Sequence, residues 1–138
     1  MFYQYHMCQQ AMWEAGLTPS SVATPFHSSF TQGQALMRQA LDNYSRVDGV
    51  FCTNDDLAIG AMQYCMEKGI RIPADMAVVG FNALDIGQAM KPKLTSVVTP
   101  REEMGNKSAQ LLIDAVNGKR SATSTYDLGY SLTNGNSW

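Results

Sequence analysis

The sequence lacks the features that mark several classes of protein. No run of 18 or more apolar residues occurs among its 138 residues, so we expect no membrane-spanning helix and no membrane partner. The first ten residues, MFYQYHMCQQ, have neither a basic start nor an apolar stretch, and we therefore expect no signal peptide and a cytoplasmic protein. The three cysteines, Cys8, Cys52 and Cys65, are scattered and have no metal-ligand spacing, which favours buried free thiols over disulfides or a zinc site.

An excess of charge of one sign is also missing. The chain has 10 Lys and Arg against 12 Asp and Glu, which gives a formal net charge of −2 at pH 7. This balance argues against a chain that binds nucleic acid or anionic membranes by itself. Charged residues make up 16% of the chain and hydrophobic residues 45%, a composition that argues against a disordered chain and predicts about one packed domain.

Catalytic motifs are absent as well. The sequence contains no nucleophile elbow, phosphate-binding loop, dinucleotide-binding glycine pattern or zinc-protease motif. His6 and His27 have no partner at the spacing of metal ligands. Asp55 and Asp56 are adjacent carboxylates, but neighbouring residues at the start of a helix point about 100° apart and do not converge on one substrate atom. We therefore expect no enzyme, no catalytic residues, no metal and no cofactor.

What the sequence does contain is an alternation of helical periodicity with short apolar runs. Such alternation is typical of an α/β fold, here a three-layer, open, mainly parallel sheet. The predicted helices span residues 2–15, 31–44, 54–69 and 101–117, and the predicted strands span residues 49–52, 77–81, 94–98 and 126–132. Before the last helix, Thr99, Pro100 and Glu102 have the spacing of a capping box with proline at the first helical position.

Open α/β sheets bind ligands at the carboxyl ends of their strands. Asn54 follows the strand at 49–52, and Asn82 and Asp85 follow the strand at 77–81. Asparagine offers a donor and an acceptor together, which suits a ligand with many hydroxyl groups. The alternative is that Asn54 only caps its helix.

Two segments carry a resemblance to a known family. VDGVFCTNDDLAIGAM at 47–62 and GIRIPADMAVVGFNALDIGQAMKPKLTSVVTP at 69–100 resemble the effector-binding core of LacI/GalR-family bacterial transcriptional regulators. FCTNDDLA, DIGQ, TPRE and DLGYSL are most similar to the gluconate-operon repressor branch. The resemblance implies that residues 1–138 form the C-terminal lobe of a type I periplasmic-binding-protein-like domain, with the first lobe and the DNA-binding headpiece outside this chain. It also implies that the helix at 101–117 packs on that first lobe.

The resemblance further implies a ligand site. Asn54 matches an asparagine that binds sugar hydroxyl groups, and Asn82 stands where many members have an aspartate. Ser28 falls where several members have a stacking aromatic, for which His27 or Phe30 could substitute.

The position of the family's ligand-clamping cation is occupied by Gln4. This difference leaves three alternatives: a neutral ligand, another cation such as Arg101, or a chain start that is not native.

The function that the resemblance implies is sensing of a sugar or sugar acid, with gluconate as the expected effector, by a homodimeric transcriptional repressor. DNA would be bound only through the headpiece. The alternative is a lobe of the sugar-binding protein of a transport system, which shares the fold.

Two apolar surfaces carry expectations about contacts. In the family the helix at 54–69 lines a dimer interface, so we expect Ile59, Met62 and Met90 to meet a two-fold partner. The alternative is a helix buried on both sides within its own domain. The stripe on the last helix needs cover, and we expect it to dock on its own lobe or on a neighbouring chain. That stripe consists of Met104, Leu111, Leu112 and Ala115.

Overall fold

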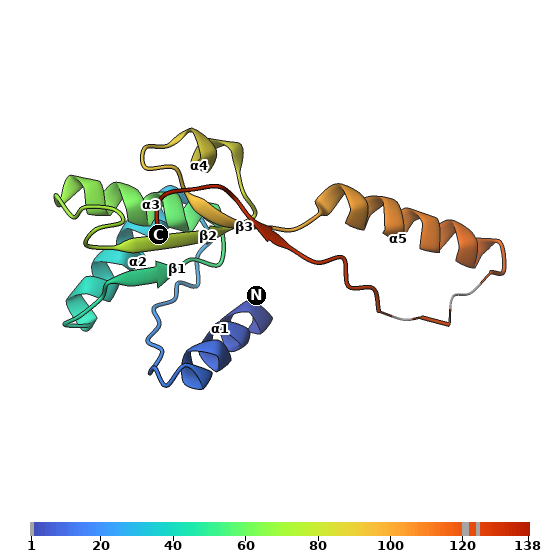
Figure 1. Ribbon diagram of the computed structural model, residues 1–138, viewed down its shortest axis with the longest axis horizontal. Helices are drawn as coiled ribbons and strands as arrows, with labels where there is room; N and C mark the ends of the chain where they lie inside the picture. Colours follow the sequence, from blue (N-terminus) through green and yellow to red (C-terminus); the bar gives the residue numbers. More distant parts are fainter. Residues whose placement is uncertain (1, 120–121, 124) are drawn as a thin grey trace.

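The computed structural model describes residues 2–119, 122–123 and 125–138, with side chains described from residue 5 onward. The elements in chain order are α1 (Phe2–Glu14), α2 (Phe30–Asn43), β1 (Gly49–Phe51), α3 (Asp55–Glu67), β2 (Ala77–Phe81), α4 (Asp85–Ala89), β3 (Thr95–Val98), α5 (Arg101–Val116) and β4 (Ser131–Leu132). Figure 1 shows the sheet with its helices at one end of the molecule and α5 extending from the other.

The four strands form one open sheet in the order β1-β2-β3-β4. β1, β2 and β3 run parallel, and β4 pairs antiparallel with β3. The connection from β1 to β2 runs through α3 and that from β2 to β3 through the short α4, since parallel neighbours need a crossover. The predicted α/β class with an open, mainly parallel sheet is therefore confirmed.

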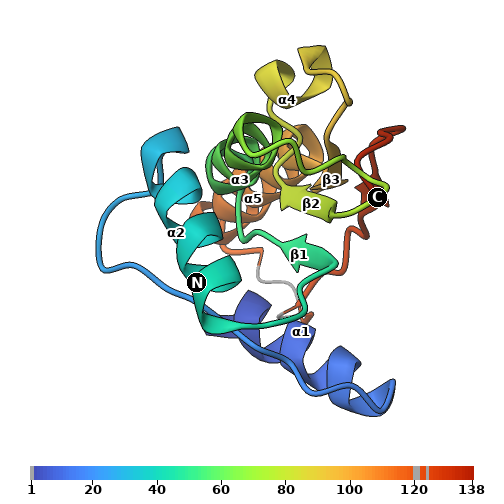
Figure 2. The same cartoon turned by 90° about the vertical axis from the view of Figure 1, so that its left-hand side faces the viewer.

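Helices α2 and α3 cover one face of the sheet (Figure 2). They approach closely because two glycines meet at their crossing. A Cβ atom on Gly33 would lie 2.3 Å from the Leu57 carbonyl oxygen, and one on Gly60 would lie 2.1 Å from the Phe30 carbonyl oxygen. The core beneath these helices consists of Met37, Ala58, Ile59, Ala61, Met62, Cys65, Met76, Val78 and Leu94.

The opposite face of the sheet has no comparable cover among the described residues. Val78 of β2 is fully buried toward the core, whereas Val79, its neighbour on the other face, is half-buried and Phe51 of β1 is exposed. Helix α1 lies beyond the β1 edge in both views (Figures 1 and 2), and none of its described side chains is buried. Two of the three expected layers are thus formed by the described elements.

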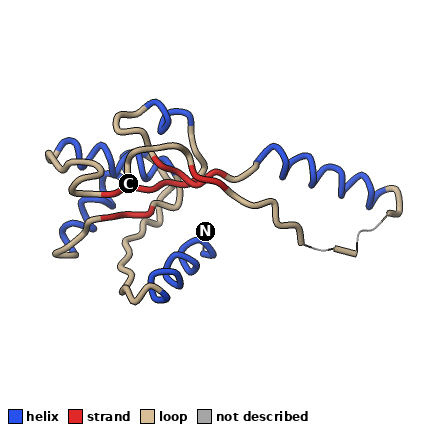
Figure 3. Tube along the Cα trace, viewed as in Figure 1, coloured by secondary structure: helices blue, strands red, loops and turns tan. Residues whose placement is uncertain are grey.

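Helix α5 projects away from the sheet (Figure 3). All 16 of its residues are described and none is buried. Met104 is 47% exposed and Leu112 67%, Ala115 is exposed, and Leu111 is half-buried. The expectation that this stripe docks on its own lobe is wrong, because no helix or strand of the described chain runs beside it. Docking on a neighbouring chain stays a prediction.

The start of α5 also differs from the predicted capping box. The N-cap residue is Pro100, and no side chain caps the helix. Pro100 has φ −75° and ψ 68°, and the Arg101 N–H donates to the Thr99 carbonyl oxygen at 2.8 Å, which is an inverse γ-turn. This turn moves the helix start one residue along the chain, so Thr99 is not at the capping position.

The strand expected at 126–132 forms only at its end, as the two residues of β4, and residues 133–138 continue across the sheet without forming a strand. Beyond the two residues of β4, Ser137 is fully buried. Its hydroxyl donates to the Val78 carbonyl oxygen at 2.6 Å and accepts from the Thr95 N–H at 2.8 Å. Through Ser137, the segment after β4 therefore connects β2 to β3 at the start of their pairing.

The three cysteines are all free thiols, as expected, but only Cys65 is buried; Cys8 and Cys52 are half-buried. Desolvation and the nearby Asp55 charge raise the pKa of the Cys52 thiol to about 12. A thiol with this pKa stays protonated at neutral pH and is a poor nucleophile. Among the described residues, no helix is both long and apolar enough to cross a membrane.

Candidate ligand-binding site

The carboxyl ends of β1 and β2 place two polar loops at one edge of the sheet. β1 and β2 pair in register with Phe51 opposite Val79, so the loops that leave them start side by side. The first loop ends at Asn54, the N-cap of α3, and the second runs from Asn82 to Leu84 before α4. The candidate residues Asn54 and Asn82 therefore stand on adjacent strand ends.

Asn54 both caps its helix and contacts a second candidate residue. Its Oδ1 accepts from the Leu57 N–H at 3.0 Å, so the capping interpretation is correct. Its Nδ2 donates to the Ser28 hydroxyl at 2.6 Å. The second Nδ2 hydrogen has no protein partner among the described residues and is available to a ligand.

Asn82 has a positive φ, a backbone conformation that is uncommon in residues other than glycine, although asparagine adopts it more often than most of them. Its φ is 102°, and that of Ala83 is 53°. The Asn82 N–H donates to the Val97 carbonyl oxygen at 2.9 Å. Its side-chain amide is half-buried and makes no hydrogen bond within the part of the chain that the structure describes.

The two aromatic substitutes for stacking differ in exposure. Phe30 begins α2 and packs against the hydrophobic core, so its ring is engaged with the protein. His27 is exposed beside the half-buried Ser28 and is the freer of the two rings. Gln4 lies on α1, and its side chain is outside the described residues.

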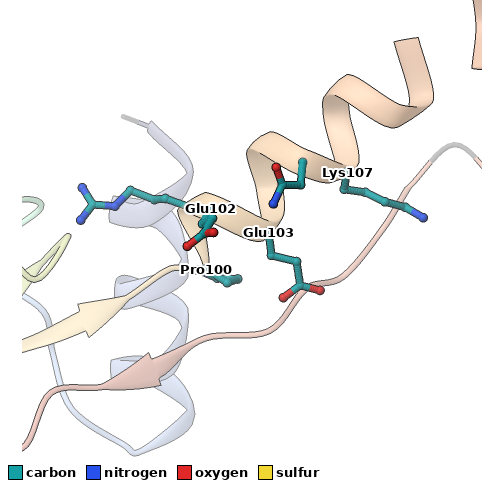
Figure 4. Close-up of a pocket in the computed structure, with 6 residues that line it drawn as sticks. Pro100, Glu102, Glu103 and Lys107 are labelled. Carbon is teal, nitrogen blue, oxygen red and sulfur yellow. The ribbon is translucent and has the colours of Figure 1, made fainter. Parts of the chain in front are cut away.

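The remaining candidates, Asp85 and Arg101, make no hydrogen bond to Ser28 or Asn54 in the part of the chain that the structure describes. Asp85 is the exposed first residue of α4. Arg101 is exposed at the start of α5, where it lines an open hollow of about 590 Å³. Figure 4 shows that Glu102, Glu103 and Lys107 in this hollow point in different directions, so they do not converge on one ligand atom. The hollow carries Arg101 as an exposed cation but is not a closed pocket.

A polar group that sequence reasoning missed lies directly beneath these loops. Asp55, interpreted above as part of a helix start, is fully buried. Its Oδ1 accepts from the Ser96 hydroxyl at 2.6 Å, and its Oδ2 accepts from the Leu84 N–H at 2.5 Å. One signal for it was available: glycine at position 80 interrupts an apolar strand, which indicates a close approach by another group. That group is Asp55.

Two of the three expected interface residues are part of the core instead. Ile59 is 1% exposed and Met62 0%, because one side of α3 packs on the sheet and the other on α2. The expectation that they meet a two-fold partner is wrong, and the alternative of a helix buried on both sides is correct for them. Met90, which follows α4, is half-buried against the core.

An open α/β sheet with free polar groups at its carboxyl edge has the architecture of a domain that binds small molecules there. The chain belongs to the family of periplasmic binding protein-like domains, which it matches over residues 5–138. It is 48% identical over 129 residues to the HTH-type transcriptional regulator GntR of Escherichia coli K12, an alignment that covers 94% of this chain and 39% of the relative. The chain thus spans about two fifths of that relative's length.

Solved structures agree with this assignment. The transcription regulator GntR of Chromobacterium violaceum matches with a TM-score of 0.87 at 34% identity, covering 94% of this chain and 48% of that one. A complex of the transcriptional regulator CelR with cellobiose matches with a TM-score of 0.82 at 30% identity, covering 94% and 40%. The resemblance to the effector-binding part of LacI/GalR-family regulators is therefore confirmed.

Proposed function

We propose that this chain is the effector-binding lobe of a cytoplasmic LacI-family repressor that senses a sugar or sugar acid, with gluconate as the first candidate. The repressor acts as a homodimer and contacts DNA through a headpiece outside this chain. Ligand binding shifts the protein between two DNA-binding states because the ligand has different affinities for them.

The observation that carries the proposal is the pair of amides at the carboxyl edge of β1 and β2. Asn54 keeps one N–H free, and the whole Asn82 amide has no partner among the described residues. Together with the Ser28 hydroxyl they offer donors and acceptors to a polyhydroxylated ligand. The cellobiose complex of CelR supports a sugar as the class of ligand.

A sugar acid also needs a partner for its carboxylate. The neutral Asn82 avoids the repulsion that an aspartate would exert on it. We propose Arg101 as the cation, since its guanidinium is exposed at the start of α5, three residues beyond the end of β3. A guanidinium binds a carboxylate through two parallel hydrogen bonds, which gives direction as well as charge.

A chimera tests the proposal. Residues 5–138 replace the matched region of Escherichia coli GntR, and calorimetry measures gluconate binding. We expect the chimera to bind gluconate and Asn82→Ala to weaken binding by about 1–3 kcal/mol, the usual cost of an unpaired polar partner. Asn43→Ala, at the exposed end of α2, is the matched control and should bind like the parent.

Two results would contradict the proposal. If Asn54→Ala and Asn82→Ala both leave the affinity unchanged, the amides are not the ligand site. Glucitol has the same open chain of hydroxyl groups as gluconate but no carboxylate, and a chimera that binds both equally would argue against Arg101 as a carboxylate partner.

A further inference from the structure

The buried carboxylate of Asp55 is satisfied entirely by neutral donors. Ser96 donates to its Oδ1 at 2.6 Å and the Leu84 N–H to its Oδ2 at 2.5 Å. None of the described cationic side chains forms an ion pair with it. A buried carboxylate is costly unless its hydrogen bonds are made, so these partners hold one another in fixed positions.

Ser96 extends this arrangement to the next backbone group. Its hydroxyl oxygen accepts from the Ala83 N–H at 3.0 Å while its hydrogen is donated to Asp55. Asp55 and Ser96 thus bind two consecutive N–H groups, those of Ala83 and Leu84. These groups follow directly after Asn82.

The loop they hold is one that needs such support. Asn82 and Ala83 both have positive φ, 102° and 53°, which costs free energy in residues with a side chain. Conformations of this kind persist only where the surroundings enforce them. Here the enforcing groups come from α3 and β3, two elements far from the loop in sequence.

Space for the carboxylate is provided by a glycine. A Cβ atom on Gly80 would lie 2.2 Å from Asp55 Oδ1 and 3.2 Å from the Ala58 Cβ. A side chain at position 80 would therefore clash with the oxygen that accepts from Ser96. The strand, the helix start and the loop are therefore fitted to one another around Asp55.

We propose that Asp55 and Ser96 are positioning residues that hold Asn82 in its left-handed conformation and so aim its amide at the ligand. Asp55 directly follows Asn54, so the same contacts set the relative placement of the two candidate amides. The consequence for ligand binding rests on the proposed function; the effect on the loop does not.

Hydrogen exchange of the 138-residue chain, followed by NMR, tests the effect on the loop. Ser96→Ala removes the acceptor for Ala83 and the donor to Asp55 with little change in volume. We expect exchange at the Ala83 and Leu84 amides to rise about tenfold, while the Met62 amide inside α3 keeps its rate. Ser45→Ala, at an exposed position, is the control and should change none of these rates. Unchanged exchange at both loop amides overturns the proposal.

A double-mutant cycle in the chimera tests the consequence for the ligand. We expect Ser96→Ala to weaken gluconate binding about tenfold when Asn82 is present and to have no further effect in the Asn82→Ala background. Asp55→Asn should restore most of the affinity lost in Asp55→Ala, because its amide can still accept from Leu84 and donate to Ser96.

The exchange rates test whether Asp55 and Ser96 hold the loop, and the double-mutant cycle tests whether they affect ligand binding through Asn82. Additive losses in the cycle indicate a merely structural role and overturn positioning through Asn82. A chimera that binds no gluconate counts against the proposed function, and the exchange rates of Ala83 and Leu84 then still decide whether Asp55 and Ser96 hold the loop.

Discussion

Helices α3 and α5 have similar lengths, 13 and 16 residues, but opposite environments. α3 buries seven residues, and α5, described over its full length, buries none. Both carry apolar residues suited to a core. The difference arises from position in the chain: α3 connects two parallel neighbours and must return across the sheet, whereas α5 leaves the sheet after β3.

This contrast shows that an apolar stripe in the sequence predicts burial against another surface, but does not predict which element or chain provides that surface. For α3 the cover is in the chain itself, in the sheet on one side and α2 on the other. For α5 the four residues Met104, Leu112, Ile113 and Val116 remain exposed in the single chain. Such a surface favours association with another surface.

The largest expected effect contrasts one apolar residue from each helix. Met62 is fully buried, so Met62→Ala should lower the free energy of unfolding by about 2–5 kcal/mol. Leu112 is 67% exposed, so Leu112→Ala should change it by less than about 0.5 kcal/mol. Urea unfolding at low protein concentration measures both values. Equal losses would show that α5 is packed in solution, and a dependence on protein concentration would then identify a second copy as its cover.

The strands and most helices could be predicted because their signals are local. The apolar runs at β1 and β2 end at polar residues, and their predicted bounds agree with the structure to within one residue. Helix α4 was missed because five residues are too few to show a helical period. The last strand was predicted too long, because the residues just before β4 share its sequence pattern but form an irregular segment beside β3.

The site was only partly predictable because its supports come from distant parts of the sequence. Asn54 and Asn82 follow strands and could be found from that alone. Asp55, by contrast, finds its partners 29 and 41 residues away, and only the folded sheet brings them together. Ile59 and Met62 show the same limit: a wide apolar arc is compatible with a dimer interface or with burial on two sides, and the position of α2 decides between them.

The next expected effect contrasts a glycine from each helix. In α3, a Cβ atom on Gly60 would lie 2.1 Å from the Phe30 carbonyl oxygen, so Gly60→Ala must push α2 away and should destabilise the chain by about 1–3 kcal/mol. In α5, a Cβ atom on Gly105 meets nothing within 4 Å, so Gly105→Ala should stabilise the helix by about 0.4–1 kcal/mol. Thermal unfolding and helical circular dichroism check both. A destabilising Gly105→Ala would reveal a close neighbour of α5 in solution and break the contrast.

The smallest expected effect concerns an exposed ion pair in the loop between α3 and β2. It tests whether a contact close to the core contributes little to the free energy of unfolding when its side chains are exposed. Arg71 and Asp75 form this ion pair at 2.6 Å, and their side chains are 75% and 39% exposed. The side-chain hydrogen bond from Arg71, with a further one from its backbone N–H, lowers the pKa of Asp75 from 3.8 to about 2. Because the pKa of Asp75 is lower in the folded state, the pair's contribution to stability is fully present above the unfolded-state pKa and is lost as pH falls through about 2.

The stability difference between the parent and Asp75→Asn should therefore be small at neutral pH, shrink between about pH 4 and about pH 2, and decrease with added salt. Urea unfolding of both proteins over this pH range measures it, and a difference that grows on acidification would contradict the assignment.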